Sequence, residues 1–107
     1  MMAKYLIQAS YSVEGMKGVL KEGGTGRRAA VEQLVKELGG SIEGFYFAFG
    51  ETDAYVIADI PDNKTAAAIG MTVGASGAAS VRTVVLLTPE EVDDATQISV
   101  GYRPPGK

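Results

Sequence analysis

The amino-acid sequence predicts an α+β domain with the element order β-α-β-β-α-β. Four segments alternate apolar and polar residues with the period of two that is typical of strands. Between them lie segments whose apolar residues recur at helical spacing, bounded by capping residues and glycine pairs. The chain has 107 residues, of which 46% are hydrophobic, so its length and composition are those of one globular domain.

The first half of the chain predicts one strand and two consecutive helices. One face of the strand, over residues 4–11, is formed by Tyr5, Ile7, Ala9 and Tyr11. Ser12 is expected to cap a helix whose apolar face is formed by Val13, Met16 and Leu20. The pair Gly23-Gly24 should end that helix, and Thr25 should cap a second one, which Gly39-Gly40 ends. The second helix has the clearest apolar face, made of Val31, Leu34, Val35 and Leu38.

The second half predicts a β-hairpin, a helix, a fourth strand and a C-terminal extension. In chain order these elements are strands 41–49 and 54–60, a helix 63–77, a strand 81–87, a short acidic helix 89–95 and an extended arm 97–102. In the first of these strands, one face is expected to carry Phe45, Phe47 and Phe49, and the other Ile42, Tyr46 and Ala48. Residues 1–96 are therefore predicted to form the domain, and residues 97–107 an arm and tail.

This order is that of the ferredoxin-like fold, an antiparallel four-stranded sheet with two helices on one face. The second and fourth strands carry large apolar residues on both faces, and a sheet of that kind cannot leave one face in water without a large apolar patch. The sheet of a second copy is the simplest cover, which predicts a homodimer or a higher oligomer. The alternative is that the C-terminal helix and arm cover this face within one chain.

Composition excludes several classes of function. The net charge of −3 argues against a general nucleic-acid binder, which needs a basic excess. The sequence contains no cysteine and no histidine, which removes thiolate chemistry, the usual general base and most transition-metal sites. We therefore expect no metal and no cofactor. No apolar run has the length of an export signal or a membrane span, so we expect a cytoplasmic protein without a membrane partner.

A glycine-rich turn before the second helix is the first candidate site. The backbone N–H groups of residues 23–26 lie at the positive end of that helix, and Arg27 and Arg28 follow directly. Two arginines are unfavourable at this position, so a bound anion would offset them. The alternative is that Arg28 pairs with Glu32, and Arg27 with Glu22 or with a partner subunit.

Aromatic side chains on the strands are the second candidate. They would line a cavity for a small, flat organic ligand at or near the interface between two sheets, and they are Tyr5, Tyr11, Phe45, Tyr46, Phe47, Phe49 and Tyr55. The polar groups of such a pocket would be Gln8, Ser10, Glu43, Asp59 and Arg82. The alternative is ordinary core and interface packing.

A lone carboxylate in the hairpin turn is the third candidate. Asp53 could act as a base or hold a cation, although an aspartate in a turn more often hydrogen-bonds its own backbone. Taken together, the ligand-binding candidates are Tyr11, Arg27, Arg28, Tyr46, Asp53 and Arg82, and no residue is assigned a catalytic role.

Several stretches of the chain resemble the GYD domain family. They are Lys4-Tyr5-Leu6, residues 15–22, Gly24-Thr25-Gly26-Arg27-Arg28-Ala29-Ala30-Val31, Phe45-Tyr46-Phe47-Ala48-Phe49-Gly50-Glu51 and Leu86-Leu87-Thr88-Pro89-Glu90-Glu91. The resemblance covers about residues 3 to 95 and implies a dimeric α/β barrel assembly. The Gly-x-Tyr-Asp motif of the family reads Gly50-Glu51-Thr52-Asp53 here. Thr52 thus replaces the tyrosine, which calls into question any role that depends on its phenol.

Three functions are compatible with these features. The sequence favours a small-molecule binding or sensing module with an apolar pocket and an organic or anionic ligand. The alternatives are a cofactor-independent enzyme of the isomerase or monooxygenase type, and a structural protein that forms oligomers without a ligand. Catalysis without histidine or cysteine would depend on groups that titrate far from neutral pH.

Overall fold

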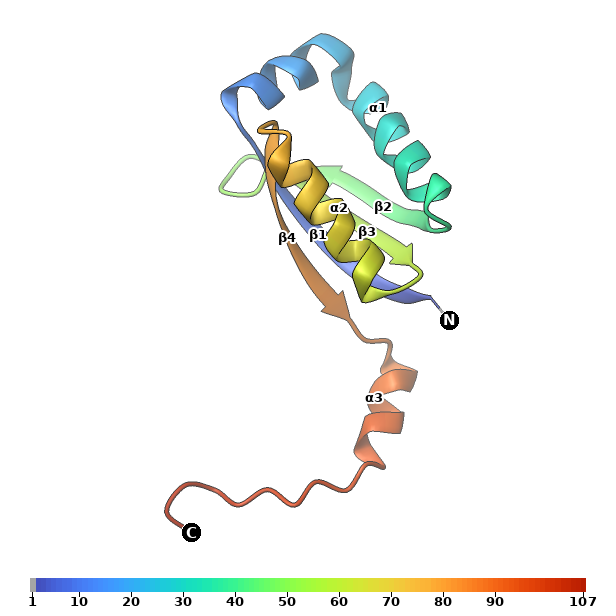
Figure 1. The fold of residues 1–107 in the computed structure, drawn as a ribbon, viewed down its shortest axis with the longest axis vertical. Coiled ribbons are helices and arrows are strands. Elements are labelled where there is room, and N and C mark those ends of the chain that lie inside the picture. Colours follow the sequence, from blue (N-terminus) through green and yellow to red (C-terminus); the bar gives the residue numbers. More distant parts are fainter. Residues whose placement is uncertain (1) are drawn as a thin grey trace.

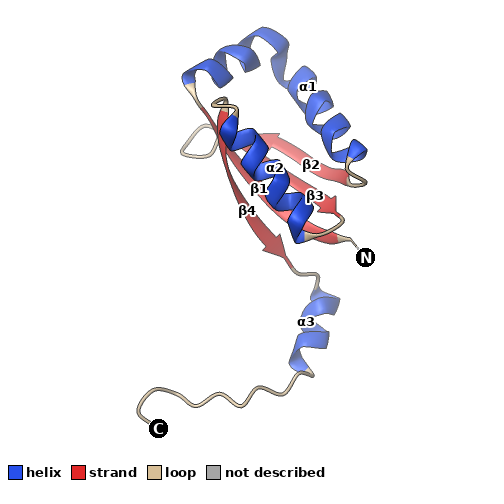
Figure 2. Cartoon of the chain, in the orientation of Figure 1, coloured by secondary structure: helices blue, strands red, loops and turns tan. Residues whose placement is uncertain are grey.

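The computed structural model describes residues 2–107 and contains one antiparallel sheet with helices on one side (Figure 1). The elements are β1 (Ala3–Tyr11), α1 (Val13–Glu37), β2 (Ser41–Phe47), β3 (Ala54–Ile60), α2 (Asn63–Ala75), β4 (Ala79–Leu86) and α3 (Pro89–Thr96). The strand order is β2-β3-β1-β4. Both α1 and α2 cover the same face of the sheet (Figure 2). The predicted ferredoxin-like α+β fold is therefore confirmed.

The helix α1 is bent in its middle. Gly23 has φ 80° and ψ 170°, a backbone conformation that a residue with a side chain rarely adopts. The predicted break at this glycine is therefore confirmed, although the two helical segments follow one another without a loop. Ser12 caps the first segment as expected, since its hydroxyl accepts a hydrogen bond of 3.1 Å from the backbone N–H of Gly15.

The first segment of α1 turns a different face to the protein from the one predicted. Val13 and Leu20 are 72% and 80% exposed, so the apolar face expected from the sequence points largely to solvent. Gly15 instead lies against the turn between α2 and β4, where Ser12 donates its backbone N–H to the carbonyl of Ala78 at 2.9 Å. The absence of a side chain at Gly15 permits this close approach, which fixes the rotation of the helix.

The core lies between the helices and the sheet. Its buried cluster consists of Tyr5, Ile7, Val56, Ala58, Ile60, Ala66 and Ile69. The predicted inward face of β1 is confirmed for its first residues, and the Tyr5 hydroxyl is satisfied by the side-chain oxygen of Asn63. Asp62 caps α2 by accepting a hydrogen bond of 2.8 Å from the backbone N–H of Thr65.

The strand β2 departs from the predicted alternation. The register of its pairing with β3 shifts between Ile42 and Gly44. Because a bulge reverses the side to which the following residues point, Ile42 and Phe45 both pack against the core, whereas the sequence placed them on opposite faces. The strand also ends at Phe47, so that Phe49 lies fully exposed in the turn.

The opposite face of the sheet has no cover within the described chain. Cross-strand partners in an antiparallel sheet share a face, and Leu6 is the partner of both Ile57 and Val84. The helix α3 and the residues after it extend away from the sheet (Figure 1), and the side chains of Ile98, Val100 and Tyr102 are exposed. The alternative in which the arm covers this face within one chain is therefore wrong. Within residues 2–107, no helix combines the length and the hydropathy needed to cross a membrane.

Candidate functional site

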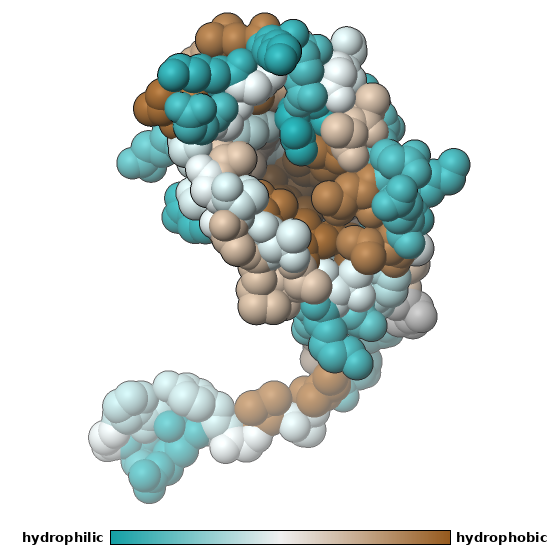
Figure 3. Space-filling view, turned by 45° about the horizontal axis from the view of Figure 1, so that its top comes forward, coloured by the Kyte–Doolittle hydropathy of each residue, from teal (hydrophilic) through white to brown (hydrophobic). Residues whose placement is uncertain are grey.

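A cavity of about 450 Å³ lies between the helices and the sheet. Its floor is formed by the helix-facing side of the four strands, and its walls by α1 and α2. Figure 3 shows a hollow with a hydrophobic interior between these elements. The volume falls within the range of about 300–1,000 Å³ that is typical of pockets for small molecules.

Small residues and the course of the two helices account for this space. α1 packs mainly on β2 at one edge of the sheet, and α2 on β4 at the other, so the middle of the sheet is left partly uncovered. Small residues border this gap on both layers, namely Ala9, Gly15, Gly18, Ala54, Ala78 and Ala79. A β-carbon at Gly18 would meet no atom within 4 Å. The cavity is thus open space beside α1 that larger side chains at these positions would fill.

Most of the cavity wall is apolar. The larger hydrophobic side chains that line it are Ile7, Val19, Val31, Leu34, Val35, Phe45, Val56, Ile69, Val73 and Val81. They come from both segments of α1, from α2 and from all four strands. A ligand body in contact with this wall would therefore be stabilised by the removal of apolar surface from water.

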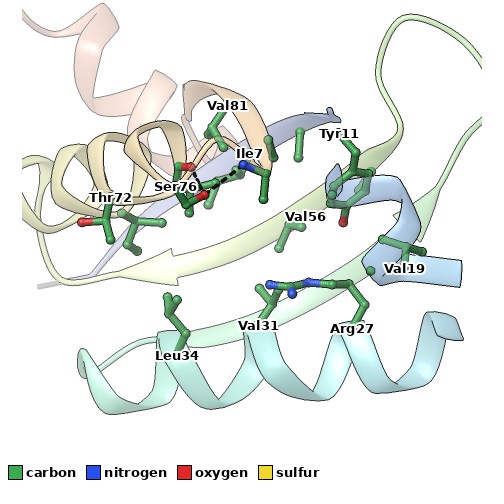
Figure 4. Close-up of a pocket in the computed structure, with 18 of the residues that line it drawn as sticks. Ile7, Tyr11, Val19, Arg27, Val31, Leu34, Val56, Thr72, Ser76 and Val81 are labelled. Atoms are coloured by element: carbon green, nitrogen blue, oxygen red, sulfur yellow. Dashed lines mark hydrogen bonds between the residues drawn. The ribbon is translucent and has the colours of Figure 1, made fainter. Parts of the chain in front are cut away.

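Polar side chains gather at one end of the cavity, where β1 meets α1. Tyr11, Glu14, Glu22 and Arg27 line it there, and in Figure 4 the Tyr11 hydroxyl and the Arg27 guanidinium both point into the cavity. Arg27 Nη1 lies 3.3 Å from Glu22 Oε1. The bend at Gly23 brings these two residues together, since they belong to different segments of α1.

The Tyr11 hydroxyl remains protonated at this position. Burial raises its pKa above the ordinary value of 10.0; the nearby Arg27 opposes the shift, and Asp53 and Glu22 add to it. Within residues 2–107 this hydroxyl forms no hydrogen bond with another group. At neutral pH it can therefore donate a hydrogen bond to a ligand, and it is poorly suited to act as a base.

Two more polar side chains line the cavity on the α2 side, Thr72 within the helix and Ser76 directly after it. The Ser76 hydroxyl donates a hydrogen bond of 2.6 Å to the Val73 carbonyl and accepts one of 3.1 Å from the Ala78 backbone N–H (Figure 4). Both bonds stay within the C-terminal end of α2 and the turn that follows. The group of Tyr11, Glu22 and Arg27 is therefore the main polar feature of the cavity.

Asp53 positions Tyr11 through a hydrogen bond to its backbone. Its Oδ2 atom accepts a hydrogen bond of 2.9 Å from the Tyr11 backbone N–H, and its own backbone N–H donates to the Ala9 carbonyl at 2.9 Å. The carboxylate of this turn residue thus binds the backbone of β1 rather than that of the turn itself. This pair of bonds holds the hairpin turn against the end of β1 and fixes the place from which the Tyr11 side chain enters the cavity.

The six candidates from the sequence are distributed over different surfaces. Tyr11 and Arg27 line the cavity and Asp53 supports Tyr11, while Arg28 lies 3.6 Å from Glu32 in an exposed pair. Tyr46 and Arg82 lie on the opposite, uncovered face, as the partners of Tyr55 and Gln8. The two arginines therefore form the glutamate pairs of the alternative interpretation, and Arg27 alone also reaches the cavity.

Several of the polar groups that the sequence assigned to a pocket between two sheets already bind other groups of the chain, and Gln8 and Arg82 lie on the uncovered face. Lys4 forms ion pairs with Glu43 and with Asp59, the latter at 3.0 Å, and these contacts raise the Lys4 pKa above its ordinary value. The Ser10 hydroxyl donates to the Glu51 carbonyl at 2.7 Å. The cavity of about 450 Å³ lies on the helix side of the sheet. A pocket between two sheets stays a prediction.

Sequence reasoning missed the part of the cavity contributed by the first segment of α1. Gly15, Gly18 and Glu22 line the cavity, whereas the apolar pattern of that segment predicted an inward face made of Val13, Met16 and Leu20. The spacing of Gly15, Gly18 and Val19 on one side of a helix was the signal that could have revealed it.

Comparison with known proteins yields one match. The family model described as the GYD domain matches residues 5–96 of the chain. The matched region includes residues 50–53, where Thr52 is buried at 7% exposure and Asp53 holds Tyr11. Searches among curated proteins and among solved structures return no significant match.

Proposed function

The chain belongs to the GYD domain family, and we propose that it is a small-molecule binding or sensing module. Its ligand would occupy the cavity between α1, α2 and the sheet. The observation that carries this proposal is the combination, in one cavity of about 450 Å³, of a mostly apolar wall with the group of Tyr11, Glu22 and Arg27 at one end. Pockets for small organic molecules typically have this composition, because apolar walls supply affinity and a few polar groups supply orientation.

The state of Tyr11 favours binding over the enzymatic alternative. A cofactor-independent enzyme would need a group that exchanges a proton near neutral pH, and the raised pKa of Tyr11 moves this hydroxyl further from that range. Arg27 is a permanent cation and serves as a donor only. The cavity therefore offers groups that orient a ligand.

Binding is tested with naphthalene as an apolar probe, followed by the methyl signals of isotopically labelled protein. The methyl groups of Val56 and Val73, which line the cavity, should shift on titration, and those of Val84 on the uncovered face should not. A Gly18→Leu variant places a side chain in the open space beside α1 and should weaken the response. If naphthalene leaves the cavity methyl groups unchanged, or shifts only those of the uncovered face, the proposal is wrong.

We further propose that the protein is a cytoplasmic homodimer, or a higher oligomer built on it, with the uncovered faces of two sheets packed together. The apolar group of Leu6, Ile57 and Val84 on that face supports the pairing, since such a group in water marks an interaction surface. The cysteine-free sequence fits a reducing compartment.

Two adjacent residues of β4 provide a matched test of the dimer. Val84 belongs to the uncovered face and is 41% exposed, whereas Val85 belongs to the helix side and is 54% exposed. Light scattering should show that Val84→Lys dissociates the dimer and that Val85→Lys leaves it intact. A wild-type monomer at micromolar concentration, or equal behaviour of the two variants, would contradict this arrangement.

A further inference from the structure

We propose that the polar end of the cavity recognises an uncharged hydroxyl group on an otherwise apolar ligand, such as a phenol or an apolar alcohol. This inference rests on the proposed binding function and specifies the chemistry of its ligand. It is carried by the arrangement of Tyr11, Glu22 and Arg27 at the junction of β1 and α1.

The charges at this end of the cavity carry no positive excess that would attract an anion. Arg27 is paired with Glu22 at 3.3 Å, and Glu14, at the rim, is paired with Lys17 at 3.5 Å. Together with the Asp53 carboxylate, which binds the Tyr11 backbone, the five formal charges around this end sum to −1. A ligand carboxylate would gain the attraction of Arg27 but would also meet the carboxylate of Glu22, so the site offers an anion little net attraction.

The polar end of the cavity offers both hydrogen-bond donors and hydrogen-bond acceptors. The Arg27 guanidinium has five N–H donors, and only the contact of Nη1 with Glu22 uses them within residues 2–107. Glu22 is an acceptor, and the Tyr11 hydroxyl is both a donor and an acceptor. A ligand hydroxyl is likewise a donor and an acceptor, so it can accept from Arg27 or Tyr11 and donate to Glu22 at the same time.

Other head groups match this set less well. A carboxylate can only accept, and it would leave Glu22 facing a like charge. A purely apolar ligand would displace water from the Tyr11 hydroxyl and the free guanidinium N–H groups without replacing their hydrogen bonds, which is unfavourable. The raised pKa of Tyr11 keeps its proton available for donation to the ligand oxygen.

The rest of the cavity determines the body of the ligand. Beyond the polar end, the wall consists mainly of branched aliphatic side chains and Phe45, with Thr72 and Ser76 on the α2 side. The Ser76 hydroxyl on α2 is occupied by two hydrogen bonds to its own chain. Thr72 offers the ligand body one further hydroxyl contact. The ligand therefore needs a polar group at the end that faces Tyr11 and an otherwise apolar body of one or two rings or a comparable chain.

Three probes with the same ring system separate the possibilities: naphthalene, 1-naphthol and 1-naphthoate. Their affinities are measured at pH 7 by titration, with the cavity methyl signals used to confirm the location. We expect 1-naphthol to bind at least about tenfold more tightly than naphthalene, the gain from one or two hydrogen bonds. It should also bind more tightly than 1-naphthoate.

Substitutions then assign the effect to individual groups. Tyr11→Phe keeps the ring and removes the hydroxyl, so it should weaken 1-naphthol severalfold and leave naphthalene unchanged. Glu22→Gln removes the balancing charge and should shift the preference toward 1-naphthoate. Arg28→Gln is the matched control, because Arg28 pairs with Glu32 outside the cavity, and it should leave all three affinities unchanged.

The outcomes distinguish the failure of this inference from that of the proposed function. If none of the three probes binds in the cavity, the binding function itself is wrong. If naphthalene binds as tightly as 1-naphthol, or if Tyr11→Phe leaves 1-naphthol unaffected, the cavity binds ligands but does not recognise a hydroxyl. If 1-naphthoate binds most tightly to the wild-type protein, the site recognises anions, and the inference is overturned.

Discussion

Alanine substitutions at Gly15 and Gly18 should change the stability of the protein in opposite directions. Both glycines lie in the first segment of α1 and both line the cavity. Gly15 faces the turn between α2 and β4, where a β-carbon would overlap the carbonyl oxygen of Ala78 and lie 2.9 Å from its carbonyl carbon. Gly18 faces open space, since a β-carbon there would meet no atom within 4 Å.

The expected magnitudes follow from these surroundings. Alanine is favoured over glycine in a helix interior by about 1 kcal/mol, so Gly18→Ala should raise the free energy of unfolding by about that amount. Gly15→Ala forces backbone against backbone, which costs roughly 1–3 kcal/mol. It also strains the 2.9 Å bond from the Ser12 backbone N–H to Ala78, at a further cost of about 1 kcal/mol if this bond is lost.

Thermal and urea denaturation, followed by circular dichroism at one fixed protein concentration, measure both effects. For a domain of this size, 1 kcal/mol corresponds to about 4–8 °C in Tm. Gly18→Ala should therefore melt about 4–8 °C above the wild type, and Gly15→Ala should melt below it. If Gly15→Ala is as stabilising as Gly18→Ala, then α1 does not pack against Ala78, and the wall of the cavity is not where the structure places it.

Three further predictions concern the helix cap, the hairpin turn and the arm. Hydrogen bonds from Thr65 lower the Asp62 pKa below its ordinary value of 3.8. The stabilisation from this carboxylate is therefore present above about pH 4 and is lost as the pH falls through the lowered pKa. Asp62→Asn still accepts a hydrogen bond but does not titrate, so melting curves from pH 6 to 2 should show a smaller loss of Tm for this variant than for the wild type. Asp53→Ala leaves the Tyr11 backbone N–H unpaired, so urea denaturation should show a free energy of unfolding that is lower by about 1–3 kcal/mol. Titration should show a greater loss of affinity for 1-naphthol than for naphthalene. If the preference for 1-naphthol is unchanged, Asp53 does not position Tyr11. Deletion of residues 97–107 should lower Tm, because their exposed apolar side chains are expected to pack on a second copy, and an unchanged Tm would show that the arm contributes nothing to assembly.

Elements with strong local signals could be predicted from the sequence. The strand over residues 54–60 has the predicted bounds, because strict alternation is enclosed between a polar turn and a proline. The last helix begins at Pro89 as predicted, and its start carries a capping box in which Thr88 and Glu91 bond each other's backbone. In both cases the residues that determine the structure lie within a few positions of one another.

Features that depend on distant contacts could not be predicted. The bulge between Ile42 and Gly44 is defined by pairing with β3, and no residue in the alternating pattern of β2 signals it. The rotation of the first segment of α1 depends on the fit of Gly15 against Ala78, 63 positions further along the chain. A pattern of apolar residues indicates an amphipathic helix, but it cannot show that a face of glycines packs more closely than a face of larger side chains.

The same limitation explains why the sequence predicted a pocket between two sheets and did not reveal the cavity on the helix side. Tyr11 and Tyr46 are both strand tyrosines, and the sequence offers no reason to separate them. The structure directs Tyr11 toward Arg27 in the cavity and places Tyr46 on the uncovered face.

The sheet is one backbone layer between these two surfaces, and consecutive residues of a strand alternate between them. Val81 on β4 lines the cavity, while the next residue, Arg82, lies on the uncovered face. The proposed ligand binding and the proposed assembly would therefore depend on different residues of the same strands, so single substitutions should separate the two.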